Sequence, residues 1–173
     1  TRAYTQGSMI GAVCTPSRTM MLTGRSWQRI PGAKDAHPEA KDPKTFLPSV
    51  LASAGYRTWH MGKGGNGFPA GLRTFQTSIL DEAKGTDNPA TDRAHASQRL
   101  ADRTIAFLKE HAGRKDGAPF YAYLAPPVPH DPRAAEPRFH AMYDPTKLTL
   151  SPAFQPVHPW DNGEMTVRDE RLA

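Results

Sequence analysis

Apolar residues recur at helical spacing in two stretches of the chain. A stripe over residues 46–54, preceded by Thr45 and closed by Gly55, predicts a helix that Thr45 caps. A longer amphipathic stripe over residues 92–111 predicts a second helix. The polar stretch 71–91 between them shows neither period, and we expect an irregular surface excursion there.

Two other stretches are typical of strands. Residues 56–61 alternate in polarity and run into the glycine-rich segment 62–67. Residues 119–125 are apolar and aromatic enough for a buried central strand, which the proline-rich loop 126–132 ends. Helix, glycine, strand and glycine-rich turn form one α/β unit. Lys63 then lies just beyond the carboxyl end of a strand, where open α/β sheets bind ligands.

A third helix is predicted at the only cysteine of the chain. Cys14 or Thr15 is a suitable cap, Pro16 suits the first helical position, and Gly24 suits the end. The thiol then lies at the positive end of the helix dipole, one turn before Arg18. Two interpretations stay open from these residues alone: a small buried hydrophobe, or a thiol placed to react near an anion.

Charge, cysteine count and the length of apolar runs argue against several classes of protein. The 173 residues carry a net charge of +5 without a run of five like charges, so we expect no nucleic-acid-binding arm, and a small anionic substrate is compatible with this charge. One cysteine permits no internal disulfide. No apolar stretch approaches the roughly 18 residues of a membrane span, and no signal segment opens the chain. It begins at Thr1 rather than Met, which we interpret as a fragment or a processed chain.

Lys63 and His130 each allow a structural interpretation. The glycine-rich segment does not match a phosphate-binding P-loop, so a solvated lysine in a turn is about as plausible as a ligand-binding one. His130 lies in a stiff proline loop at the carboxyl edge of the predicted sheet, where a histidine can serve structure or function.

Three landmarks, in order, give the chain a resemblance to a known family. Residues 14–18, Cys-Thr-Pro-Ser-Arg, followed by Leu-Thr-Gly-Arg at 22–25, resemble the signature at which type I sulfatases oxidise a cysteine to formylglycine. The segments 54–58 and 62–63 resemble the family's Ala-Gly-Tyr-x-Thr and Gly-Lys words. Residues 129–132 match its Pro-His-x-Pro motif after an aromatic strand.

The resemblance implies an α/β fold, the alkaline-phosphatase-like α/β/α sandwich, here incomplete. Residues 1–173 would form a partial catalytic domain that lacks the N-terminal metal-binding strand and the C-terminal part. The family histidine expected two residues after Lys63 is replaced by Gly65, and His60 lies within a strand and is not a convincing substitute. Asp161 and Asn162 resemble a family calcium pair but follow no hydrophobic strand, which favours a simple turn.

The resemblance also implies a mechanism for sulfate-ester hydrolysis. Cys14, oxidised by a separate formylglycine-generating enzyme, would hydrate to a diol that attacks sulfur and then expels sulfate. Arg18 and Lys63 would hold the diol and the sulfuryl oxygens, and His130 would contact the sulfate and help protonate the leaving alcohol. Calcium would bind sulfate and the modified Cys14, with most of its ligands outside this chain.

Two alternatives to sulfate-ester hydrolysis remain: a phosphate or phosphonate ester hydrolase on the same scaffold, and an inactive anion-binding fragment. The resemblance implies a sulfated small molecule or carbohydrate as substrate and a periplasmic or secreted location for the parent protein. Because four metal ligands and one family histidine are missing, we expect the isolated chain to be inactive.

Overall fold

The computed structural model describes residues 14–32, 42–64, 68–81, 89–130, 135–154, 166–167 and 170–171. The chain divides into two compact units, residues 1–136 and 137–173. The first unit holds the sheet, the long helices and all four candidate site residues of the sequence analysis. Residues 65, 161 and 162, which bear on the predicted histidine loss and the calcium pair, lie outside the described part of the chain.

A parallel three-stranded sheet forms the centre of the first unit. Its strands are β1 (Arg57–Gly62), β2 (Thr77–Leu80) and β3 (Phe120–Ala125), in the order β2-β1-β3. Gly62, the last residue of β1, is in register with Leu80 of β2 and Ala125 of β3. All three strands therefore end at the same edge, and the segments that follow them are neighbours.

The strand predicted over residues 119–125 is present as β3, but its predicted central position does not hold in the described sheet. Within the described sheet β1 has a neighbour on each side, whereas β3 lies at an edge and exposes Phe120 and Leu124. Apolar composition reports how well a strand packs on its two faces, and it carries no information about which strand is paired on both sides.

The prediction of an irregular stretch over residues 71–91 is also wrong. This stretch contains β2 and the end of the short helix α3 (Pro69–Leu72), and the long helix α4 (Pro89–Ala112) begins within it. Three of the four β2 residues are exposed, so the strand shows no readable alternation. Hydrogen bonding to β1, rather than its own pattern, makes this segment a strand.

The helix predicted at the cysteine is present, but it begins earlier than predicted: Cys14 and Thr15 are helical rather than capping residues, and Pro16 is the third helical residue instead of the first. Helix α1 spans Cys14–Thr23, and Gly24 follows it with φ 66°, the left-handed conformation that glycine adopts at little cost. Two threonine hydroxyls bond back to carbonyls one turn earlier, Thr19 to Thr15 and Thr23 to Thr19, both at 2.7 Å.

Helix α2 (Leu47–Ser53) is present as predicted, but Thr45 is not its cap. Phe46 precedes the helix and makes no side-chain capping bond. Thr45 instead ends a short 3₁₀ helix, Pro43–Thr45, that Asp42 caps through a 3.2 Å bond from the Lys44 amide. Each of these two helices has a proline in its first turn, where the missing N–H costs no hydrogen bond, so a second helix can begin directly after the first.

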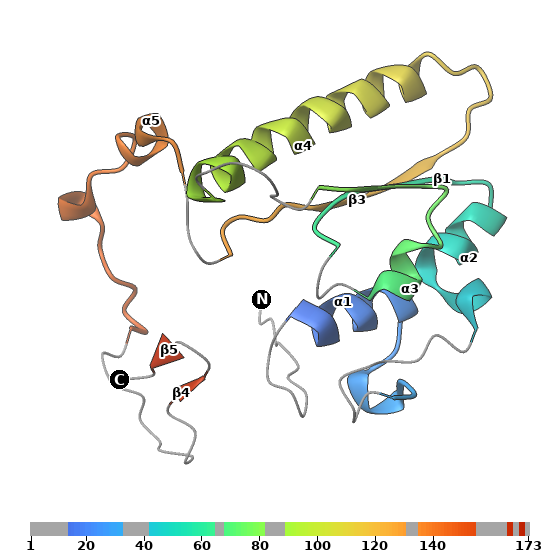
Figure 1. The fold of residues 1–173 in the computed structure, drawn as a ribbon, viewed down its shortest axis with the longest axis horizontal. Helices are drawn as coiled ribbons and strands as arrows, with labels where there is room; N and C mark the ends of the chain where they lie inside the picture. The colour runs from blue at the N-terminus through green and yellow to red at the C-terminus, as the bar shows by residue number, and fades with distance from the viewer. Residues whose placement is uncertain are drawn as a thin grey trace. The chain divides into compact units, whose positions relative to one another are not determined.

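Helices cover both faces of the sheet, as Figure 1 shows: α4 lies on one side of the strands, and α1, α2 and α3 lie on the other. Each face has its own core. On the α4 side, Trp59, Met61, Leu100 and Phe107 are buried, and the Trp59 and Phe107 rings stack at 4.9 Å. This α/β/α layering is what the alkaline-phosphatase-like fold predicts.

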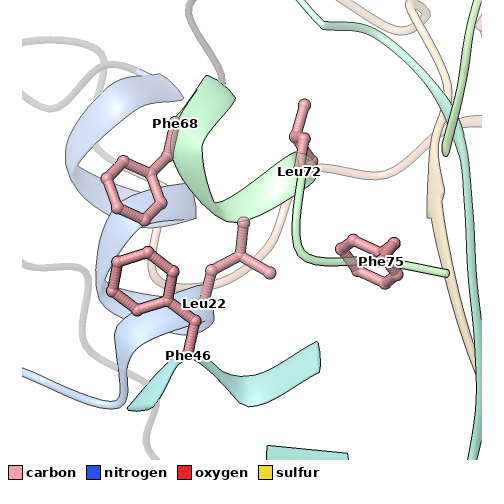
Figure 2. Close-up of a cluster of buried hydrophobic side chains, with 5 residues drawn as sticks. All are labelled: Leu22, Phe46, Phe68, Leu72 and Phe75. Atoms are coloured by element: carbon pink, nitrogen blue, oxygen red, sulfur yellow. The ribbon is translucent and has the colours of Figure 1, made fainter. Parts of the chain in front are cut away.

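The second core, which we call the α1-side cluster, consists of Leu22, Phe46, Phe68, Leu72 and Phe75. Figure 2 shows the Phe46 and Phe68 rings beside Leu22, with their centroids 5.1 Å apart in an edge-to-face arrangement. Leu22 is fully buried. Because Leu22 belongs to α1, this cluster fixes the helix that carries Cys14 against the sheet.

The remaining described elements are short. A 3₁₀ helix, Trp27–Arg29, follows α1. The second unit contains α5 (Pro137–His140), a 3₁₀ helix at Pro145–Lys147 and a hairpin of β4 (Thr166–Val167) with β5 (Glu170–Arg171). No helix among the described residues combines the length and apolar character that crossing a bilayer requires.

Gly62 is required where β1 approaches β3. Its φ is +125°, and a Cβ at this position would lie 2.1 Å from the Ala125 carbonyl oxygen. We expect Gly62→Ala to lower the free energy of unfolding by about 3 kcal/mol, measured by urea denaturation, because backbone must move. Gly55→Ala is the control: it shares the positive φ but meets nothing within 4 Å, so about 1 kcal/mol is expected. Equal losses would contradict the steric argument.

Candidate active site

Cys14 is the first residue of α1 and is half-buried. The α1-side cluster holds the helix by its buried face, which Pro16, Thr19 and Leu22 form. Cys14 does not belong to this buried set. The structure therefore favours a thiol at the margin of the helix, near its positive end, over a thiol packed as a core hydrophobe.

Lys63 reaches this thiol from the sheet. Its amide donates to the Ala125 carbonyl at 2.8 Å, which continues the pairing of β1 with β3 by one residue. Its half-buried side chain brings Nζ to 3.7 Å from the Cys14 sulfur. Two residues 49 positions apart thus meet at the carboxyl edge of the sheet, where the sequence places Lys63.

Arg18 is the third member of the site. It lies one helical turn after Cys14, and its Nη1 donates to the Lys63 carbonyl at 3.4 Å. The guanidinium also lies close enough to Tyr123 for its charge to act on that phenol. One cation therefore lies beside the sulfur, and a second, one turn along the helix, bonds to the backbone of the first, an arrangement at a helix N-terminus that favours a negatively charged ligand.

His60 of β1 and Tyr123 of β3 lie close enough to Arg18 for its charge to act on both. They face each other in the parallel register of β1 and β3, with ring centroids 5.3 Å apart. His60 is fully buried; its Nδ1 lies 2.9 Å from the Ser78 hydroxyl, and its Nε2 has no hydrogen-bond partner among the described residues. Burial raises the pKa of Tyr123 above its usual value, and the positive charge of Arg18 opposes that rise.

Sequence reasoning missed Tyr123 as a neighbour of Arg18. The available signal was strand alternation: residues 58, 60, 121 and 123 all belong to the face that α1 covers, provided that β1 and β3 pair in parallel. Without that register the two strands cannot be related to each other.

His130, the fourth predicted site residue, lies shortly after β3 and is half-buried. Because β1 and β3 end together, it follows the same edge of the sheet as Lys63. The peptide bond Val128–Pro129 just before it is cis. Its predicted catalytic role stays a prediction.

The described residues provide no calcium site by themselves. No three His, Cys, Asp or Glu side chains in that part of the chain gather closely enough to hold a metal ion. The described side chains that the structure places near Cys14 include Lys63 and Tyr123, and neither of these is a carboxylate. Calcium prefers carboxylate and carbonyl oxygens.

The His60 imidazole predicts a pH-dependent stability. Burial, and second the Arg18 charge, lower the pKa of His60 from 6.5 to about 4. Between these pH values the unfolded chain binds a proton that the folded chain does not. The contribution of His60 to the free energy of unfolding is therefore fully present above the unfolded pKa, and it is lost as the pH is lowered. We expect a loss of about 3 kcal/mol as pH falls through this window.

The measurement is urea unfolding above pH 7 and again near pH 4. His60→Gln keeps a hydrogen-bonding side chain for Ser78 but does not titrate, so it should remove most of this pH dependence whatever its own stability. If the free energy of unfolding of His60→Gln changed with pH as steeply as that of the wild type, groups other than His60 would cause the effect.

Comparison with known proteins identifies the family to which the sequence is similar. The sulfatase family model matches residues 2–161. An arylsulfatase of Volvox carteri is 24% identical over 175 residues, which cover 86% of this chain and 26% of that protein. The chain thus spans about a quarter of the length of this relative. No solved structure matches the chain.

The fold and the site together define an α/β protein with a thiol and two cations at the carboxyl edge of a parallel sheet. The family match extends over most of the sequence and includes Cys14, Arg18, Lys63 and His130. The chain belongs to the sulfatase family.

Proposed function

We propose that the full-length protein hydrolyses sulfate esters through a formylglycine made from Cys14. The observation that carries the proposal is the approach of Lys63 Nζ to within 3.7 Å of the Cys14 sulfur, with Arg18 bonded to the Lys63 carbonyl. A nucleophile beside Lys63, with Arg18 next to that lysine, suits attack on an anionic ester, because both charges can balance the developing charge on the sulfuryl oxygens.

One hydroxyl of the aldehyde hydrate made from Cys14 attacks sulfur and displaces the alcohol, which leaves the sulfuryl group on that hydroxyl oxygen. The second hydroxyl then loses its proton and re-forms the aldehyde C=O bond, which breaks the bond from carbon to the sulfate oxygen and releases sulfate. Lys63 and Arg18 hold the ester oxygens through their positive charges. His130, following β3 at the same edge, donates a proton to the alcohol oxygen as its bond to sulfur breaks. Each of these residues acts from α1 or from a segment that follows a strand.

The same proposal includes a substrate class, a maturation partner, a cellular location and a metal ion. The substrate is a sulfated small molecule or carbohydrate, the maturation partner is a formylglycine-generating enzyme, and the location is periplasmic or secreted. Calcium is proposed as the ion that binds sulfate and the modified Cys14, with most of its ligands from outside this chain. The match to an arylsulfatase supports an aryl sulfate as the first substrate to test.

The test compares an aryl sulfate with the corresponding aryl phosphate and phosphonate at equal concentration, using the full-length protein made together with a formylglycine-generating enzyme. Preferential turnover of the sulfate supports the proposal. Preferential turnover of a phosphorus ester would assign the site to the alternative reaction, and binding of inorganic sulfate without any turnover would assign it to anion binding.

A further inference from the structure

Lys63 brings a primary amine to the side chain that the proposed function converts to an aldehyde. Its Nζ lies 3.7 Å from the Cys14 sulfur. Conversion replaces this sulfur by oxygen, and the aldehyde carbon is the Cβ atom of residue 14, which carries the sulfur beforehand. Lysine amines form Schiff bases with carbonyl carbons. The amine is therefore a neighbour of a carbon with which it can react before any substrate enters the site.

The structure holds both groups at this separation. Lys63 is half-buried, and its amide donates to the Ala125 carbonyl at 2.8 Å, which ties its backbone to β3. Cys14 is half-buried on α1, and the fully buried Leu22 packs that helix into the α1-side cluster. Arg18 of the same helix donates to the Lys63 carbonyl at 3.4 Å. Groups held together in this way react as an intramolecular pair, with an effective concentration far above that of free amines in solution.

On the basis of the proposed function, we propose that the aldehyde made from Cys14 forms an internal imine with Lys63 while no substrate is bound. The Lys63 ammonium gives a proton to solvent, and its nitrogen then attacks the aldehyde carbon. The aldehyde oxygen leaves as water, so that one C=N bond replaces one C=O bond and no oxidant or reductant is consumed. Water reverses the reaction and restores the amine and the aldehyde. The imine is thus a resting form outside the catalytic cycle.

Borohydride reduction distinguishes the two forms of residue 14 in the full-length protein, made together with a formylglycine-generating enzyme and kept free of sulfate esters. It converts an imine to a stable secondary amine and a free aldehyde to the hydroxymethyl side chain of serine. Trypsin releases residue 14 in the peptide 3–18, and a modified Lys63 is not cleaved, which leaves the peptide 58–73 intact. Mass spectrometry then reports the imine as these two peptides linked, and the free aldehyde as an unlinked peptide with serine at position 14.

We expect at least about tenfold more of the linked pair from the folded protein than from the same protein unfolded in urea before reduction, because unfolding removes the fixed proximity. Equal linkage in the folded and unfolded protein would overturn the proposal, since the reaction would then need no defined site. A folded protein that gives only the unlinked peptide overturns it as well.

Two lysine variants assign the amine. Lys63→Met should abolish the linked pair, because methionine has no amine. Lys44→Ala is the matched control: Lys44 is exposed on a short 3₁₀ helix, and its loss should leave the linked fraction within about twofold of the wild type. Equal losses of linkage in both variants would overturn the assignment to Lys63.

The same reduction separates this inference from the proposed function. An unlinked peptide with serine at position 14, from a protein that hydrolyses an aryl sulfate, removes the imine and leaves the sulfatase proposal. A linked pair from a protein that hydrolyses no aryl sulfate removes the sulfatase proposal and leaves the imine. If residue 14 keeps its thiol, both proposals fail.

Discussion

Turnover of an aryl sulfate by the full-length protein should fall at least about a thousandfold when Cys14 is replaced by alanine, because the variant has no side chain from which the nucleophile can be made. Folding should be unchanged. Cys14 lies at the margin of α1 and does not belong to the buried clusters, so the lost sulfur leaves no large cavity. Steady-state kinetics on the purified variant measure the effect.

The control for this variant is Met21→Ala on the same helix. Met21 is 43% exposed, and its truncation should leave kcat/KM within about twofold of the wild type. A Cys14→Ala protein that retains a tenth or more of wild-type turnover would show that the nucleophile is elsewhere.

Lys63→Met should lower kcat/KM for the same substrate by about a hundred- to a thousandfold, the usual effect of removing one group that stabilises developing charge. Methionine keeps an unbranched side chain and removes only the charge that lies 3.7 Å from the Cys14 sulfur. The backbone bond from Lys63 to Ala125 does not depend on the side chain, so the edge of the sheet should persist.

Lys44→Ala serves as the matched loss of a positive charge. Lys44 is exposed on a short 3₁₀ helix, and surface charges of this kind contribute little beyond the screening distance. If both lysine variants reduced turnover equally, the effect would reflect net charge rather than a cation placed at the nucleophile.

The local elements of the site were predictable from the sequence. Proline after Cys14 and glycine at position 24 indicate the start and end of α1, and Gly55 ends the run of α2. The alternation that precedes Gly62 places Lys63 at a strand end. These are short-range signals, because each depends on the φ and hydrogen-bonding needs of one or two residues.

The long-range relations were not predictable in the same way. Strand β2 is exposed at three of its four positions and exists through its pairing with β1. The proximity of Lys63 to Cys14 requires α1 to lie over the end of β1, and the facing of His60 and Tyr123 requires the parallel register of β1 and β3. Local residue patterns carry no information about such contacts, because each contact depends on elements that are distant in the sequence and meet only in the assembled sheet.

The central claim is that Cys14 becomes the formylglycine nucleophile of a sulfate-ester hydrolase. Mass spectrometry of the tryptic peptide that spans residues 3–18 tests it most directly, after production of the full-length protein with a formylglycine-generating enzyme. We predict that the thiol-bearing side chain is converted to an aldehyde, and that aryl sulfate turnover rises with the converted fraction. A peptide that retains its thiol throughout, in a protein that nevertheless hydrolyses the aryl sulfate, would contradict the claim.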